Sequence, residues 1–210
     1  MAIRRVAGLA MLVLAAGTSA PAQRPTLAAP NQAVPILQEI VATQAFEERV
    51  NQYVTLHRLL EGPLPALRTT RDMGQLQMTV MALALRIRTA RADAHQGDLI
   101  RPDVARMFRH RIATCLPADE WAAVLADNAA EAEEEDEEEG VPAGPPAPLQ
   151  VNMKWPEREL FGFVPPQLLA VLPRLPEELQ YRIIGNALVL WDHHANLIVD
   201  FMPDAFAVLT

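Results

Sequence analysis

Residues 179–201 read LQYRIIGNALVLWDHHANLIVDF, and this stretch decides the architecture of the C-terminal part of the chain. Three runs within it, 179–184, 187–192 and 197–201, have the length and the apolar, β-branched or aromatic content of strands. Gly185 and Asn186 predict a two-residue hairpin turn, and residues 193–196 predict a four-residue turn before the third run. The stretch therefore predicts an antiparallel meander, which is stable only when another element covers one of its faces.

The residues that lead into this meander change from alternating to helical spacing. Val151, Met153 and Trp155 alternate with other residues, as in a short strand. Residues 164–173, which read VPPQLLAVLP, predict a short helix that begins at its prolines. We therefore assign residues 151–210 to a small α+β module.

The preceding part of the chain carries apolar residues at helical spacing. They recur at steps of three and four over residues 35–61, and Gly62 and Pro63 end this segment. Asp72 is a capping residue for a second helix that runs to about Gly97, and Pro102 opens a third. A fourth helix begins near residue 117. Because amphipathic helices bury their apolar sides against one another, we predict a helical bundle of about four helices over 34–130, and class α+β for the whole chain.

Residues 131–150 separate these two parts by composition. Residues 131–139 are acidic except for Ala132, and residues 140–150 read GVPAGPPAPLQ. Negative charges at a helix C-terminus oppose the helix dipole and repel one another, so we expect the fourth helix to fray by about Glu133. The composition predicts a disordered, solvated linker over 131–150.

The first 22 residues indicate export from the cytoplasm. Arg4 and Arg5 precede an apolar run over 6–16, and the small-residue pattern Ala20, Pro21, Ala22 follows. The run has about half of the roughly 20 residues that cross a bilayer, so we interpret 1–22 as a cleaved signal peptide and 23–33 as a flexible leader. The sequence thus predicts a periplasmic or extracellular protein with no stable membrane span after removal of the signal.

Composition narrows the classes of function. The formal net charge of −8 and the acidic run argue against nucleic acid as a partner. Cys115 is the only cysteine, so no internal disulfide is expected, and we interpret it as a small buried residue. Ser19 is the only serine and lies in the signal peptide, and the chain contains no zinc-protease or phosphate-loop motif. We therefore expect no catalytic residues and no cofactor.

His193 and His194 are the candidate site residues that the sequence singles out. With Asp192 and Asn196 close by, they could provide nitrogen and oxygen ligands to nickel, copper or zinc. Neighbouring side chains at a strand end point to opposite faces, so a polar turn is the competing interpretation. His57 lies on the apolar side of the first predicted helix, and we interpret it as a hydrogen-bonded core residue rather than a ligand.

Residues 175–201 resemble the C-terminal module of several small exported bacterial proteins. The shared features are Leu-Pro at 175–176, Tyr-Arg at 181–182, a glycine turn, a Val-Leu strand and Ile-Val-Asp at 198–200. One family with this module comprises periplasmic accessory proteins of nickel and cobalt efflux. The rest of the chain, including FEERVNQYVTLHRLL at 46–60, is similar to uncharacterised exported proteins of soil bacteria. The resemblance implies a bacterial envelope setting and the fold of the C-terminal part.

Two functions stay open from the sequence. The preferred one is a non-catalytic binding module of the envelope, whose partner is another envelope protein or component and whose contact surface is the arginine-rich helices or a free sheet edge. The alternative is a low-affinity metal-binding or metal-stress accessory protein of the periplasm that uses His193 and His194. A hydrolase would require a polar cleft in which histidines and acids converge.

Overall fold

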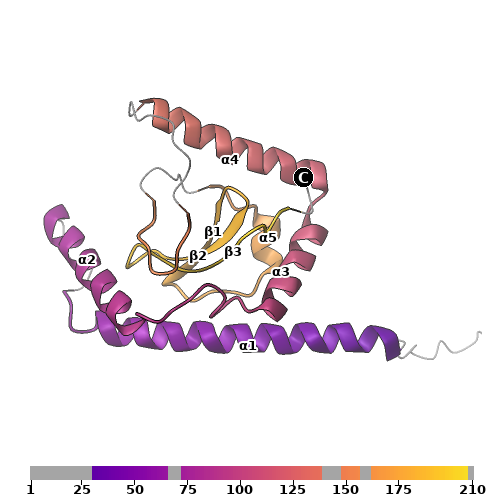
Figure 1. The fold of residues 1–210 in the computed structure, drawn as a ribbon, viewed down its shortest axis with the longest axis horizontal. Helices are drawn as coiled ribbons and strands as arrows, with labels where there is room; N and C mark the ends of the chain where they lie inside the picture. The colour runs from indigo at the N-terminus through magenta and orange to yellow at the C-terminus, as the bar shows by residue number, and fades with distance from the viewer. Residues whose placement is uncertain (1–29, 66–71, 139–147, 157–161, 208–210) are drawn as a thin grey trace, which may run out of the picture.

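The computed structural model describes residues 30–65, 72–138, 148–156 and 162–207 (Figure 1). The elements follow one another along the chain in an order that confirms the α+β class and the C-terminal meander. They are α1 (Pro30–Glu61), α2 (Met73–Ala90), α3 (Pro102–Cys115), α4 (Ala118–Glu138), α5 (Pro166–Val171), β1 (Leu179–Ile184), β2 (Ala187–Asp192) and β3 (Leu197–Met202).

The three strands form one antiparallel sheet in the order β1-β2-β3. Ile184 pairs with Ala187 across the two-residue turn, where Gly185 has a φ of +52°, a conformation that suits glycine. The register of β2 and β3 shifts between Leu190 and Trp191, which is a β-bulge. The predicted turns and the bounds of the first two strands are confirmed, and β3 is one residue longer than predicted.

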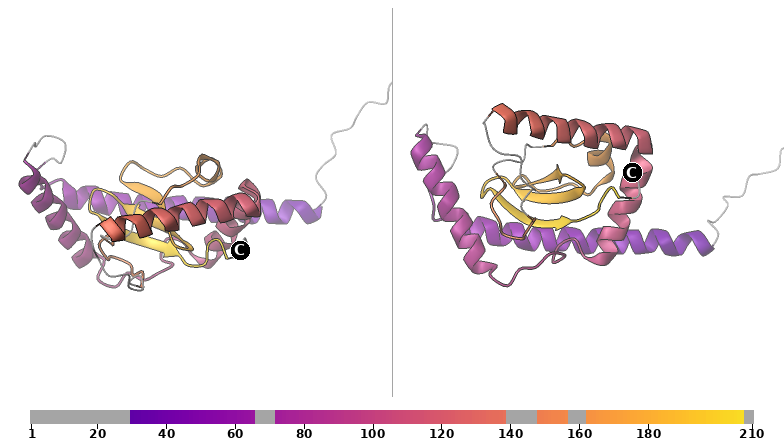
Figure 2. Two further views of the ribbon diagram at one scale, coloured as in Figure 1. Left: turned by 90° about the horizontal axis from the view of Figure 1, so that it is seen from above. Right: turned by 45° about the horizontal axis from the view of Figure 1, so that its top comes forward.

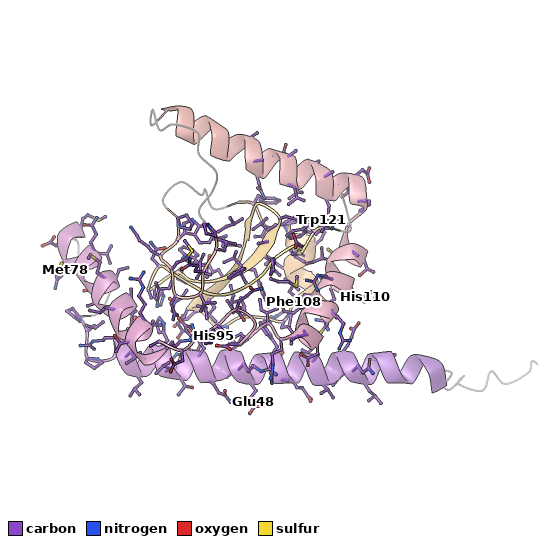
Figure 3. The ribbon with its side chains drawn as sticks, viewed as in Figure 1. Glu48, Met78, His95, Phe108, His110 and Trp121 are labelled. Atoms are coloured by element: carbon purple, nitrogen blue, oxygen red, sulfur yellow. The ribbon has the colours of Figure 1, made fainter. Side chains whose placement is uncertain are left out.

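The helices lie around the sheet. α1 runs along one side of it, α3 and α4 border two further sides, and α2 extends from the C-terminal end of α1 (Figures 1 and 2). Phe46 of α1 and Phe108 of α3 meet edge to face with their ring centroids 5.2 Å apart, and Phe108 also contacts Tyr181 of β1. Figure 3 shows Phe108 and Trp121 directed toward the interior, and Met78 at the periphery. The main hydrophobic core thus crosses the predicted boundary between 34–130 and 151–210.

The other face of the sheet is covered by the segment before α5. The rings of Trp155 and Trp191 have their centroids 5.3 Å apart there, and the two residues form a second apolar cluster with Ile198 and others. The backbone NH of Asn152 donates to the carbonyl of Ile198, and the NH of Ile198 donates to the carbonyl of Met153. The strand predicted at 151–155 is reduced to one isolated antiparallel bridge, between Lys154 and Leu197, beside these backbone hydrogen bonds to β3.

Helix ends differ from the sequence prediction in two places. α2 ends at Ala90 instead of near Gly97, because residues after Ala90 form a loop whose backbone is bound by the carboxylate of Asp200. α4 continues to Glu138, so the predicted fraying by Glu133 is wrong. Alanine and glutamate are strong helix formers, and each like-charged pair costs only about 0.2–0.5 kcal/mol, which is too little to end the helix.

Several predictions concern segments at the margins of the described structure. Residues 131–138 of the predicted linker belong to α4, and 139–147 lie outside the described residues. The predicted signal peptide, 1–22, also lies outside them. Residues 30–33 of the predicted leader belong instead to the first turn of α1. Proline suits that position because the first turn of a helix does not need its missing NH. Among the helices described, none has the length and apolar content needed to span a bilayer.

Candidate functional site

The carboxylate of Asp192 is the centre of a buried polar cluster between α1 and the β2–β3 turn. Asp192 is the last residue of β2 and is 0% exposed. Its Oδ2 accepts the hydroxyl of Tyr53 at 2.5 Å and lies 2.6 Å from Nδ1 of His57, while its Oδ1 accepts the backbone NH of Ala195 at 2.8 Å. Tyr53 and His57 are one helical turn apart on α1, so this single carboxylate joins the helix to the sheet.

The hydrogen bond to Asp192 sets the tautomer of His57. Because a carboxylate accepts at Nδ1, that nitrogen carries the proton, and Nε2 of the neutral ring is left with a lone pair. Nε2 is buried and has no hydrogen-bond partner within the described part of the chain. The atom that it faces, Oε2 of Glu61 at 3.4 Å, is an acceptor as well.

His194 brings a second ring nitrogen to the same place. Its Nδ1 is buried, lies 3.6 Å from Oε1 of Glu61 and has no hydrogen-bond partner among the residues that are described. The rings of His57 and His194 have their centroids 5.6 Å apart. One ligand atom from each of His57, Glu61 and His194 can be chosen so that all three lie within 4.8 Å of one another. The site thus contains two imidazole nitrogens and a carboxylate in a group small enough to surround one metal ion.

Local folding explains why these side chains meet. His57 and Glu61 are four residues apart and therefore share a face of α1, which ends at Glu61. The turn after β2 is fixed by the bond from Ala195 to Asp192 and by the positive φ of Asn196, 51°, which brings His194 toward the end of α1.

The two histidines that the sequence singled out have different positions. His194 reaches the cluster, whereas Nε2 of His193 lies 2.6 Å from the carbonyl oxygen of Glu177. His57 is buried and hydrogen-bonded, as expected, but its second nitrogen faces the cluster. Sequence reasoning missed His57 and Glu61 as possible ligands. The signal that could have identified them is their spacing of four residues on one predicted helix.

The charges around the cluster shift the pKa values of the two histidines in opposite directions. Burial lowers the pKa of His57, but the hydrogen bond and charge of Asp192, aided by Glu61, outweigh burial and raise it above its ordinary value. Burial, together with the charge of His193, lowers the pKa of His194. His57 is therefore the more basic of the two candidate nitrogen ligands.

Further polar and charged residues flank the site. Glu178 is 2% exposed, and its Oε1 accepts Nε of Arg58 at 2.5 Å. Burial raises the pKa of Glu178, but the bond from Arg58 outweighs it and holds the pKa below the ordinary value. The guanidinium of Arg91 lies 5.0 Å from the ring centroid of Tyr53, in a cation–π contact. These contacts hold the Tyr53 and His57 side of the cluster in place.

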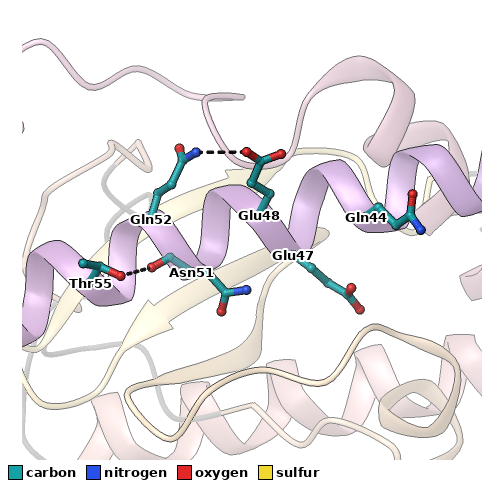
Figure 4. A pocket seen from close by; sticks show the side chains of 6 residues that line it. All are labelled: Gln44, Glu47, Glu48, Asn51, Gln52 and Thr55. Atoms are coloured by element: carbon teal, nitrogen blue, oxygen red, sulfur yellow. Dashed lines mark hydrogen bonds between the residues drawn. The ribbon is translucent and has the colours of Figure 1, made fainter.

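A depression on α1 offers a different kind of surface. Its lining side chains are Gln44, Glu47, Glu48, Asn51, Gln52 and Thr55 (Figure 4). They project outward along the exposed side of the helix, and Gln52 donates to Glu48 at 3.5 Å. No histidine lies among them, so this depression is not the polar cleft with converging histidines and acids that a hydrolase would require.

Comparisons with known proteins identified no relative of this chain. No family model matches the chain, and neither a curated protein nor a solved structure matches it significantly. The resemblance of residues 175–201 to nickel and cobalt efflux accessory proteins therefore stays a prediction.

Proposed function

We propose that this protein binds one divalent transition-metal ion through Nε2 of His57, the carboxylate of Glu61 and Nδ1 of His194. The observation that carries the proposal is that three acceptor atoms converge, two of them buried nitrogens without hydrogen-bond partners in the described chain. Buried polar atoms in native proteins are almost always paired. A cation placed among these atoms would satisfy all three at once.

The donor set favours a particular class of metal ion. Two imidazole nitrogens and one carboxylate suit zinc, nickel, cobalt and copper(II) better than calcium or magnesium, which prefer oxygen ligands. Asp192 has the arrangement of a supporting carboxylate: it binds the Nδ1–H of His57, fixes the orientation of the ring and increases the basicity of Nε2. In the metal-free protein, the alternative cation is protonated His57 itself, with Nδ1 facing Asp192 and Nε2 facing Glu61.

The setting of this function is the bacterial envelope, as the export signal in residues 1–22 predicts. The preferred prediction from sequence, binding of another envelope component through arginine-rich helices, has less structural support. Several of these arginines bind the protein's own backbone: Arg88 donates to the carbonyl of Asn152, Arg91 to that of Val199 and Arg111 to that of Val171. The alternative, a metal-binding accessory protein, agrees better with the geometry, with His57 and Glu61 in place of His193.

Calorimetric titration of zinc and nickel into the full chain tests the proposal. We expect one ion per chain for the wild type and a loss of affinity of roughly tenfold or more in Glu61→Gln and His194→Ala. His193→Ala is the matched control, because it removes the neighbouring imidazole but leaves the three ligands, and it should bind like the wild type. Absence of binding to the wild type, or an equal loss in the two histidine variants, would refute the proposal.

A further inference from the structure

We propose that the metal ion at this site keeps one coordination position open for a neutral imidazole donor from outside the chain, such as a histidine side chain of the molecule that delivers or receives the ion. This inference rests on the proposed function and concerns what the site does with its ion. A structural zinc site is closed by four protein ligands, whereas a site that exchanges a ligand keeps a position free. The described chain brings three ligand atoms together here.

Two neighbouring donors, Asp192 and His193, are engaged elsewhere. Both oxygens of Asp192 accept hydrogen bonds, from Tyr53 and His57 on one side and from Ala195 on the other. Nε2 of His193 is bound to a backbone carbonyl. A three-ligand ion that prefers four ligands would therefore complete its coordination from the solvent side, with water in the isolated protein.

The exposure of the three ligands shows which side is open. The side chain of His57 is 0% exposed, that of His194 is 18% exposed and that of Glu61 is 30% exposed. The site is therefore closed at His57 and reaches the surface between Glu61 and His194. A donor from a second molecule can approach the ion only from that side.

The local charge favours a neutral donor over an anionic one. Glu61, Asp192 and Glu178 are three carboxylates around the site, and Arg58 neutralises one of them. Arg91 also lies beside the cluster, against Tyr53, but it interacts more strongly with Asp200 than with Asp192. A divalent cation balances the remaining two charges, so an added carboxylate would leave the site with an excess of negative charge. A neutral imidazole completes the coordination without that penalty.

One residue of the chain competes with the outside donor. Oε2 of Glu178 is buried and has no hydrogen-bond partner among the described residues, and the charge of Glu178 acts on His57. If its side chain reoriented when the metal binds, Glu178 would become the fourth ligand and close the site. A Glu178→Gln variant distinguishes this arrangement from an open site, because it keeps the shape of the side chain and weakens it as a ligand.

The test is a titration of imidazole into the full chain loaded with cobalt(II), followed by visible absorption. We expect the ligand-field bands to shift and saturate with imidazole alike in wild type, His193→Ala and Glu178→Gln, while cobalt stays with the protein after desalting. In wild type and His193→Ala, whose carboxylates are unchanged, the bands should respond less to acetate. Failure of the wild type to take up cobalt contradicts the proposed function itself.

Other outcomes overturn only the open position. If the bands do not change with imidazole in the wild type but do change in Glu178→Gln, Glu178 closes the site. If they change in His193→Ala but not in the wild type, His193 closes it. Bands that ignore imidazole in all three proteins also show a closed site. An equal response to acetate would overturn the preference for a neutral donor, and loss of cobalt to imidazole would show that no mixed complex forms.

Discussion

Asp192 and Asp200 are two fully buried carboxylates on adjacent strands, and they are satisfied in different ways. Asp200 accepts four backbone NH groups, from Gly97, Leu99, Ile100 and Phe201, each at 2.8 Å. Asp192 accepts one backbone NH, from Ala195, and otherwise pairs with the side chains of Tyr53 and His57. One aspartate is thus bound by donors that cannot titrate, and the other by side chains that can.

This difference separates a structural carboxylate from a functional one. Backbone amides keep their protons at every relevant pH, so Asp200 fixes the loop after α2 onto β3. His57 has a second nitrogen that stays unpartnered in the described chain, so the polar network around Asp192 ends in an incomplete cluster. Incomplete satisfaction of buried polar groups is the property that marks the second region as a candidate site.

The largest expected effect on stability belongs to the structural carboxylate. In Asp200→Asn, the amide group must face two of the four backbone NH donors whichever way it is turned, so two donors lose their acceptor. We expect the free energy of unfolding to fall by about 3 kcal/mol, measured by urea denaturation, with the metal stoichiometry unchanged. A loss under about 1 kcal/mol, or loss of the metal site in the folded variant, would remove the distinction between the two aspartates.

The same substitution at Asp192 should mainly lower the affinity for the metal ion. Asp192→Asn weakens the acceptor that orients His57, and removal of such a supporting carboxylate lowers metal affinity by about 10–100-fold. Calorimetry with zinc measures the change, and circular dichroism confirms the fold. Wild-type affinity in a folded Asp192→Asn protein would mean that Asp192 is structural, like Asp200.

Tyr53→Phe sharpens the comparison by removing a donor to Asp192 that is not itself one of the proposed ligands. The variant keeps the ring under Arg91 and loses the hydroxyl bond of 2.5 Å. We expect stability to fall by about 1 kcal/mol in urea denaturation. Zinc affinity should change by no more than about threefold, since His57 keeps its bond to Asp192. An affinity loss as large as that of Asp192→Asn would show that Tyr53 also positions the ligand.

The smallest expected effect is on how the stability of the metal-free protein depends on pH, because burial opposes the upward shift of the His57 pKa. The folded protein raises the pKa of His57 above 6.5, so the stabilisation from its proton is complete below 6.5 and is lost as the pH rises through the higher folded-state value. The stability difference between wild type and His57→Gln, measured by urea denaturation with chelator present, should therefore be larger at about pH 6 than at about pH 9. A gap that is constant or grows with pH would contradict the assignment.

The sheet and its turns were predictable from the sequence because their information is local. Gly185 and Asn186 fix the register of the first hairpin, and the two flanking strands follow residue by residue. The ends of α2 and α4 were not predictable from local rules. The first depends on the distant carboxylate of Asp200, and the second on helix propensity that outweighs repulsion between glutamates.

The site was only partly predictable, for a related reason. The sequence indicates His194 but gives His193 equal weight, since only the turn geometry separates them. His57 meets Asp192 across a separation of 135 residues, and no spacing rule reveals such a pair. The spacing of His57 and Glu61 was visible, but on an apolar helix face it also fits an ordinary core residue.

Anomalous diffraction from crystals of the zinc-loaded full chain tests the central claim most directly. We predict one peak at about 2.0–2.2 Å from Nε2 of His57, Nδ1 of His194 and a carboxylate oxygen of Glu61, with Asp192 still bound to Nδ1 of His57. Absence of a peak at these three residues, or a peak only at exposed groups such as His95 or His110, would contradict the account.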